Sequence, residues 1–268
     1  MKRGVGIGNR LLRKGFTILC SLLLSLSPVF AGEKLVLAGP PWAPFLYEEN
    51  PHTGLASEIV TAAFAKSGYE VEILPLPWRR IMWHVESQEI DGVAGIWRSA
   101  ERDEMLHFST PYHVNRIVIA SNQETPIIDG QLEHLHGQKV GFRRGAYYGD
   151  AIMEDDDIQR QAVSNDRNML HMLAAQRLDA GIGDYLILEH IIRANPHLRA
   201  RIHLDRESLV DIPIHVAMVE GRGDAGQRTE DFNRGLQQLH DSGRLLEILQ
   251  DYGVESLPPR IDEHLNSN

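Results

Sequence analysis

The sequence predicts an α/β protein of two lobes, each a mostly parallel sheet flanked by helices, with two crossovers between the lobes. Residues 34–94 alternate strand and helix in the order β-α-β-α-β, which is typical of a sheet covered by helices. A second α/β unit of similar size follows in residues 139–192. Two extended segments, near Ser121 and near Val216, join the two units. A chain that leaves one lobe and later returns to it makes a hinge, and the cleft between such lobes is a natural ligand site.

The spacing of apolar side chains locates the elements of the first lobe. Glycine and proline end its first strand at Gly39-Pro40-Pro41, and the stiff aromatic loop Trp42-Ala43-Pro44-Phe45 follows directly. The predicted elements are a strand at 34–38, a helix from 54 that is stopped at 67–68, a strand at 69–74, a helix beginning at 78, and a strand at 90–94.

The same reading locates the rest of the chain. One apolar strand, at 212–219, has no pairing partner nearby in the sequence. The other predictions are strands at 115–120, 139–142 and 180–182, an acidic loop at 154–157, and helices from 147, at 166–176, 185–192, 228–239 and 245–249. We expect one lobe to comprise 32–121 and 218–258, the other 122–217, and 259–268 to form a C-terminal tail, with a loose structure from 258 onward.

The first 31 residues are typical of a secretory signal peptide. Five basic residues and no acidic ones precede an apolar run at 16–26, and Val29-Phe30-Ala31 satisfies the small-residue rule for cleavage after Ala31. The apolar run is shorter than the roughly 20 residues that span a bilayer.

The cysteine content and the net charge limit the classes of function and partner that the chain can have. The single cysteine, Cys20, lies in the leader, and Leu19 before it argues against a lipid anchor. Without disulfides, an exported chain must be stabilised by its core. The net charge of −10 becomes more negative when the basic leader is removed, which argues against nucleic acid and against an anionic membrane surface as partners.

The segment from Ile90 to Tyr112 has the pattern of an anion site. A strand opens into a turn and a short helix that Ser99 can cap, and Arg102 stands one turn later. Helix starts that follow strand ends hold small anions, and the planar guanidinium of arginine matches a carboxylate. The alternative is that Arg102 pairs with neighbouring acids at 101, 103 or 104 on a solvated helix face. Spacing alone favours that alternative.

Thirteen histidines raise the question of a metal. The tightest pair is His134 and His136, but no cysteine remains after processing and no carboxylate stands at a ligand-like offset. The acidic loop 154–157 lacks the glycine and the alternate spacing of a calcium loop. We expect no metal and no cofactor.

Seven ordered motifs indicate a family. The mature chain resembles the family-3 extracytoplasmic solute-binding proteins, which serve polar amino-acid ABC transporters and have the type II periplasmic binding fold. LPWRR at 76–80 is similar to a subgroup with Pro-Trp-x-Arg at a helix start. The motifs are PWAPF (41–45), GLASEIV (54–60), IDGVAG (90–95), SAERDEMLHFSTPY (99–112), LHGQKVGFRRG (135–145), LDAGIGD (178–184) and FNRGLQQLHDSGRLLEILQDYG (232–253).

The resemblance implies roles for particular residues. Arg102 would bind the α-carboxylate of the ligand and Asp184 its α-ammonium, with Trp42 stacking on the ligand side chain and Trp78 as the opposing wall. A core anchor remains the alternative for Trp42, a core cover for Trp78 and a helix cap for Asp184. The remaining implied ligand-binding residues are Gly95, Trp97, Ser99, Ala146 and Tyr147, with Arg80 and Arg144 as secondary candidates.

Three positions depart from the family pattern. Trp97 replaces a hydroxyl residue, and Ala146 and Tyr147 replace two Ser or Thr. Each lost neutral hydrogen bond is worth about 0.5–1.5 kcal/mol, so the changes can shift the preferred ligand. The two aromatic rings can shrink the pocket or stack on a flat or cationic ligand.

The resemblance implies a periplasmic binding protein that closes around a small polar solute, an amino acid or related carboxylate, and delivers it to the membrane permease of an ABC transporter. We expect a monomer without enzymatic activity. One alternative is a periplasmic dehydratase of the cyclohexadienyl type on the same fold, which needs an acid poised to protonate a leaving hydroxyl. Another is a ligand-sensing subunit for a membrane receptor.

Overall fold

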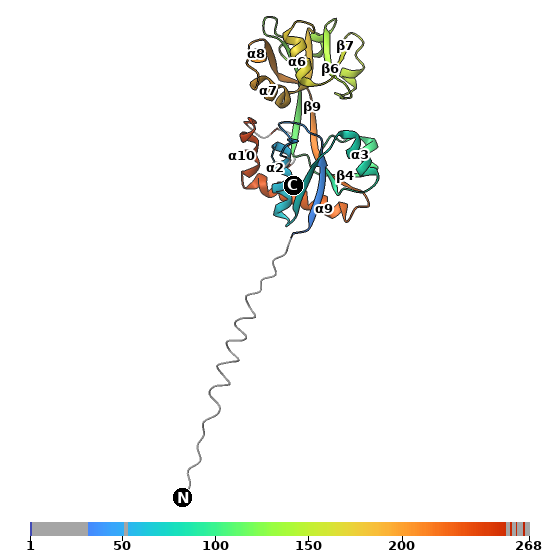
Figure 1. Cartoon of the computed structure of the whole chain (residues 1–268), viewed down its shortest axis with the longest axis vertical. Coiled ribbons are helices and arrows are strands. Elements are labelled where there is room, and N and C mark those ends of the chain that lie inside the picture. The colour runs from blue at the N-terminus through green and yellow to red at the C-terminus, as the bar shows by residue number, and fades with distance from the viewer. Residues whose placement is uncertain (2–31, 51–52, 256–257, 259–260, 262–264, 266–268) are drawn as a thin grey trace. The chain divides into compact units, whose positions relative to one another are not determined.

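Strand β9 (Ile202–Val219) takes part in both halves of the sheet in this computed structural model, and can be followed from one half to the other in Figure 1. Up to Ile214 it pairs antiparallel with β5 (His113–Asn122), and from His215 onward it pairs with β3 and β4. Among the described residues the strand order is β2-β1-β3-β9-β5-β8-β6-β7, with β4 beside β9. Strands β5 and β9 therefore form an antiparallel hinge ribbon between the lobes.

The structure describes residue 1 and residues 32–50, 53–255, 258, 261 and 265, so the predicted leader lies outside the described residues apart from Met1. The other strands are β1 (Lys34–Gly39), β2 (Glu70–Pro75), β3 (Gly92–Ile96), β4 (Leu106–Phe108), β6 (Lys139–Arg143), β7 (Gln159–Val163) and β8 (Ala180–Asp184). The helices are α2 (Leu55–Lys66), α3 (Trp78–Glu86), α4 (Ala100–Asp103), the 3-10 helix η1 (Leu132–Leu135), α5 (Asp150–Met153), α6 (Asp166–Ala174), α7 (Tyr185–Arg193), α8 (Pro196–Arg199), α9 (Ala225–Asp241) and α10 (Arg244–Asp251). No helix in the described part of the chain combines the length and the apolar character that a membrane crossing requires.

The first lobe has the predicted parallel core. Strand β1 lies between β2 and β3 and pairs parallel with both. Helix α2 buries the apolar face that its spacing predicts, with Leu55, Ile59, Ala63 and Phe64 inaccessible to solvent. Helix α9 packs on α2 at Gly235, because only a residue without a side chain leaves room for the backbone of Ala63 there.

A buried carboxylate joins three elements of this lobe. Oδ2 of Asp91 accepts a hydrogen bond from the backbone N of Val36 at 2.8 Å. Its Oδ1 lies 3.0 Å from Nη1 of Arg228 and 3.2 Å from Nε of Arg222. Pairing of this kind is what makes a buried charge tolerable, and it ties β1 to the segment that begins α9.

The second lobe is also parallel at its centre. Strand β6 pairs parallel with β7 and β8, and β8 pairs antiparallel with β5. Strand β7 is absent from the prediction because it lies at the sheet edge and buries only Val163, so its sequence lacks an apolar alternation.

Several boundaries differ from the prediction. Strand β9 begins ten residues before position 212, because its polar first half is held by pairing along β5. Helix α5 begins at Asp150 and not at Tyr147. Strand pairing changes from one sheet to the other between Ile214 and His215. The lobe boundaries at 121–122 and 217–218 stay predictions.

The prediction of a loose tail is wrong for two of its residues. Ile261 and Leu265 have buried side chains and belong to the main hydrophobic cluster. Two apolar residues spaced four apart are a pattern too short to stand out in the sequence. The other positions from 259 to 268 all lie outside the described residues.

We expect Gly235→Ala to destabilise the protein, because a Cβ there would lie 2.0 Å from the carbonyl oxygen of Ala63. Helices α2 and α9 would have to separate, and overpacking of this kind costs about 1–3 kcal/mol. Urea unfolding followed by circular dichroism measures the change. Gly226→Ala in the same helix is the control, since its Cβ would meet only Asp224, at 3.7 Å. Equal midpoints for the two variants would contradict the close packing of the helices.

Candidate ligand-binding site

Arg102 is held by its own loop and is half-buried. Its guanidinium Nη1 donates to the carbonyl oxygen of Trp97 at 2.5 Å, and its central carbon lies 4.9 Å from the ring centre of Trp78. No ion pair to Arg102 occurs among the described residues, whereas Asp103 pairs with Arg98 at 2.8 Å. The solvated ion pair that spacing favours is therefore not formed.

Burial lowers the pKa of the Arg102 guanidinium, an effect that the charge of Glu101 opposes. A guanidinium stacked on an indole with donors left over is well suited to a carboxylate, because the fork can bind two oxygens at once. The position agrees with the role that the family resemblance implies, and that role stays a prediction.

A hydrogen-bonded chain leads from the Arg102 loop to Asp184. Trp97, which follows β3, donates its indole Nε1 to Oδ1 of Asn115 on β5 at 2.7 Å. Nδ2 of Asn115 donates to Oδ2 of Asp184 at the end of β8, at 2.6 Å. Together with the bond between Arg102 and Trp97, this relay connects the predicted cation of one lobe with the predicted carboxylate of the other.

Asp184 is buried and caps helix α7, which confirms the helix-cap interpretation. Its Oδ1 accepts from the backbone N of Ile187 at 3.0 Å. Burial raises the pKa of Asp184 to about 7, although the hydrogen bonds from Ile187 and Asn115 lower it. A carboxyl group with this pKa is poised to ionise when a cation arrives, so a cap and a ligand contact are compatible.

Trp42 stacks on Phe45, with 4.4 Å between the ring centres, and packs partly buried against the main core cluster. Its indole Nε1 is buried and has no partner within the described part of the chain. A Cβ on Gly95 would lie 3.7 Å from the ring of Trp42 and 3.0 Å from the hydroxyl of Tyr112. Trp42 and Gly95 are therefore neighbours, as a shared site requires, and part of the Trp42 ring serves the core.

The remaining predicted residues lie at the surface or near it. The hydroxyl of Ser99 makes no cap bond, although its carbonyl oxygen accepts from the backbone N of Arg102 at 3.0 Å. Tyr147 is 54% exposed, and its hydroxyl donates to the carboxylate of Asp150, so its ring is not held in a pocket. Ala146 is half-buried, and Arg80 and Arg144 are exposed.

Two functional candidates on β5 are absent from the sequence-based prediction. Asn115 is fully buried and is the centre of the relay, and His113 is buried against Phe45 with 5.5 Å between ring centres. Burial lowers the pKa of His113 to about 3. The signal was a polar residue at 113 and another at 115, on either side of Val114 and shortly before the apolar run 117–120. Their partners lie far away in the sequence.

A hollow of about 600 Å³ opens beside this ribbon. Asp184 and His113 line it, and so do Asp211 and the segment 253–255 after α10. Two buried atoms in its lining, Nδ1 of His113 and Oδ1 of Asp211, have no hydrogen-bond partner among the described residues. Trp42, Trp78, Trp97 and Arg102 do not belong to this lining.

The structure also groups three potential metal ligands. Donor atoms of His136, Asp155 and Asp157 lie within 4.8 Å of one another. The spacing of these residues in the sequence does not predict the group, because the acidic loop lies beside His136 only in the folded protein. Nε2 of His136 is 3.0 Å from Oδ2 of Asp155. Two of the three are exposed, and the bond to His136 lowers the pKa of Asp155. An exposed ion pair accounts for the group.

Comparisons with known proteins agree with the fold. Residues 35–255 match the bacterial extracellular solute-binding proteins, family 3. The arginine-binding extracellular protein ArtP of Bacillus subtilis (strain 168) is 23% identical over 228 residues, which cover 80% of this chain and 84% of that protein.

Solved structures show the same architecture. An ancestral arginine-binding protein bound to arginine has a TM-score of 0.67 at 23% identity, over 83% of this chain and 99% of that one. A histidine kinase sensor domain with similarity to periplasmic binding proteins has a TM-score of 0.70 at 21% identity, over 85% and 99%. At these identities the likeness establishes the type II periplasmic binding fold.

We expect Asp184→Asn to stabilise the ligand-free protein increasingly as the pH rises. In the wild type the pKa of Asp184 is about 7 when folded, against 3.8 for an ordinary aspartate, so the folded state holds the extra proton between these values. Stability is then lost as the pH rises through this window. Asparagine does not ionise and can still cap α7.

Chemical denaturation at pH 4.5 and pH 8 tests this, and the gain should reach a few kcal/mol at pH 8. Asp156→Asn, at an exposed position in the second lobe, controls for the loss of one carboxylate. A gain for Asp184→Asn that is equal at both pH values would contradict the raised pKa.

Proposed function

Since the chain belongs to family 3 of the bacterial extracellular solute-binding proteins, we propose that it captures a free amino acid between its lobes, with the α-carboxylate on Arg102 and the α-ammonium on Asp184. Closure of the lobes about the hinge ribbon brings the two half-sites onto one ligand. The ligand binds the closed state better than the open one, and this difference drives the closure.

The observation that carries the proposal is the relay from Arg102 through Trp97 and Asn115 to Asp184. A zwitterion needs a cation and an anion held at separate points. Arg102 has no carboxylate partner among the described residues, and Asp184 has two donors that fix its orientation but no cation. Each group can therefore still form an ion pair with a ligand.

Arginine is the first ligand to test. Two relatives by sequence carry arginine-binding in their names. Trp42, Trp78 and Trp97 offer aromatic faces suited to a flat cationic side chain. Ala146 has no hydroxyl donor, and the hydroxyl of Tyr147 is bonded to Asp150. The exposed ring of Tyr147 leaves space for an extended ligand.

We further propose that the closed form delivers its ligand to the permease of an ABC transporter, as a monomer in the periplasm after cleavage behind Ala31.

The similarity to a histidine kinase sensor domain does not favour a sensing role, because that likeness is one of fold. A dehydratase would need a base paired with its acid. Within the described part of the chain, the Asp184 carboxylate accepts from a backbone N–H and from the Asn115 amide, neither of which is a base. We therefore propose a binder and not an enzyme.

We expect Arg102→Ala to weaken arginine binding about 10–100-fold, because a charge-assisted hydrogen bond is worth about 1.5–3 kcal/mol. Isothermal titration calorimetry measures the dissociation constant, after a thermal-shift screen of the amino acids. Arg98→Ala is the control, since Arg98 is exposed and pairs with Asp103. Equal losses in both variants, or none in Arg102→Ala, would exclude Arg102 as the carboxylate site.

We expect arginine binding to tighten as the pH rises from 6 to 8. The ammonium group needs the ionised carboxylate, and a pKa of about 7 for Asp184 leaves most molecules protonated at pH 6. The dissociation constant should fall roughly tenfold over this range and then level off. Asp184→Asn should bind weakly and lose this pH dependence. A wild-type affinity that is the same at pH 6 and pH 8 would argue against a contact between Asp184 and the ligand.

A further inference from the structure

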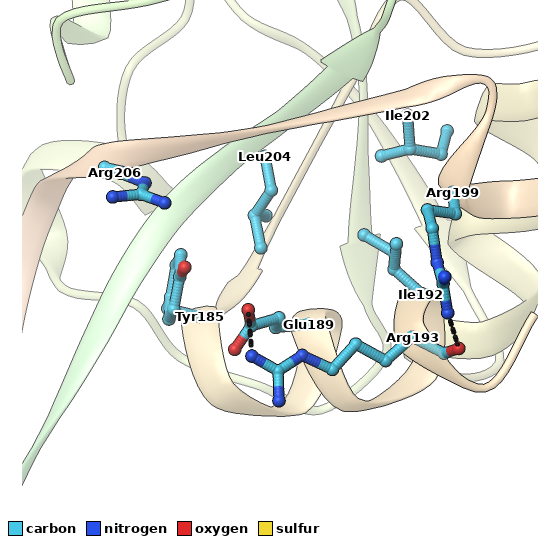
Figure 2. A pocket seen from close by; sticks show the side chains of 8 residues that line it. All are labelled: Tyr185, Glu189, Ile192, Arg193, Arg199, Ile202, Leu204 and Arg206. Carbon is cyan, nitrogen blue, oxygen red and sulfur yellow. Dashed lines mark hydrogen bonds and ion pairs between the residues drawn. The ribbon is translucent and has the colours of Figure 1, made fainter. Parts of the chain in front are cut away.

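Arginine side chains gather around a second hollow, of about 490 Å³, on the second lobe (Figure 2). It lies between helix α7, the end of α8 and the first half of β9. We call it the arginine pocket. It is lined by Tyr185, Glu189, Ile192, Arg193, Arg199, Ile202, Leu204 and Arg206.

The arginine pocket has an excess of positive charge. Glu189 is the one acid in its lining, and Nη2 of Arg193 already pairs with it at 3.1 Å. The guanidinium of Arg199 donates to the carbonyl oxygen of Arg193 at 2.5 Å. Neither Arg199 nor Arg206 has a carboxylate partner in the described part of the chain. In a protein of net charge −10, such a concentration of uncompensated arginine favours an anionic ligand.

The floor of the arginine pocket is apolar. Ile192 lies on α7, and Ile202 and Leu204 extend from β9 toward that helix in Figure 2. The ring of Tyr185 closes the end near Arg206. Ile192 and Ile202 are already buried, so the apolar surface that a ligand can cover comes from Leu204 and the ring of Tyr185. An organic anion would bury that surface and gain about 25 cal/mol for each Å², whereas an inorganic ion would not.

The arginine pocket shares no lining residue with the relay of Arg102, Trp97, Asn115 and Asp184, although Tyr185 in its lining follows Asp184 directly. Successive residues of a strand point to opposite faces, so Arg116 on β5 faces away from Asn115. Arg116 stands over the ring of Tyr185 at 5.6 Å and donates to the carbonyl oxygen of Arg206. Through Arg116 the ribbon thus contacts two lining residues of the arginine pocket, whereas Asn115 is bonded to Trp97 and Asp184.

The neighbouring hollow is a poorer site for an anion. It shares Tyr185, Glu189, Arg193 and Arg206 with the arginine pocket, but its lining also contains Asp184, Asp211 and Glu255. Like charges would repel an anion there, so the ligand belongs in the arginine pocket.

We propose that the arginine pocket binds a small organic anion, a carboxylate or phosphate with an apolar portion, at a site distinct from the amino-acid site. The acidic group lies against the guanidinium group of Arg206, at the end of the hollow near Tyr185. The apolar portion covers Leu204 and the ring of Tyr185, both of which are partly exposed.

Calorimetric titration with phenyl phosphate, inorganic phosphate and phenol tests this proposal. Phenyl phosphate should bind at least tenfold more tightly than either of the other two, because only it carries both features. Raising the sodium chloride concentration should weaken its binding. Arg206→Ala should weaken it at least tenfold, whereas Arg206→Lys, which keeps the charge, should retain more of the affinity. Arg199→Ala, at the other end of the hollow, should weaken it less.

Two variants distinguish the arginine pocket from general surface charge and from the amino-acid site. Arg177→Ala removes an exposed arginine of the same lobe and should leave the binding of phenyl phosphate unchanged. Arg102→Ala should also leave it unchanged, even where it abolishes arginine binding. Loss of phenyl phosphate binding in Arg102→Ala but not in Arg206→Ala would place the anion at the amino-acid site and overturn the proposal. Equal affinity for inorganic phosphate, or no binding of phenyl phosphate, would overturn it as well.

Discussion

The side-chain amide of Asn115 is the contact on which the site depends. The indole N–H of Trp97 can only donate, and an ionised Asp184 can only accept. A group between them must accept on one side and donate on the other, and the buried amide does both. A carboxylate at this position would face Asp184 with like charge, and an aliphatic side chain would leave two buried polar groups unpaired. The amide therefore sets the geometry of both half-sites.

The hinge ribbon has two chemically different faces. Asn115 belongs to the face where the predicted carboxylate and ammonium sites are connected, whereas Arg116 lies over the ring of Tyr185, which lines the arginine pocket. This division follows from the alternation of side chains along a strand. Because β9 pairs with β5 in one lobe and with β3 and β4 in the other, the same ribbon carries the chain between the lobes. The same two strands therefore both connect the lobes and carry residues of the candidate sites.

Much of the fold could be predicted because its elements have clear local patterns. The apolar face of α2 and the strand that delivers Asp184 agree with the structure. The segments that the sequence failed to predict share a physical cause, because contacts with residues distant in the sequence hold them in their folded conformation. Strand β7 buries only Val163, the first half of β9 is polar, and Ile261 and Leu265 gain their burial from the core. Of the predicted site, Arg102 and Asp184 are connected through the relay, whereas Tyr147 is turned to its neighbour Asp150.

Local patterns in the chain were enough to predict the alternation of strands and helices and the family, because periodicity and ordered motifs are properties of neighbouring residues. Arg102 and Asp184 were singled out by the family resemblance, since spacing alone favoured an ion pair for the one and a helix cap for the other. Only the folded molecule shows that Asn115 stands between Trp97 and Asp184, and that arginines from α7, α8 and β9 surround one hollow. Strand pairing and helix packing bring these residues together across long stretches of chain. No local pattern records such a meeting, since each residue taken alone is an ordinary polar side chain.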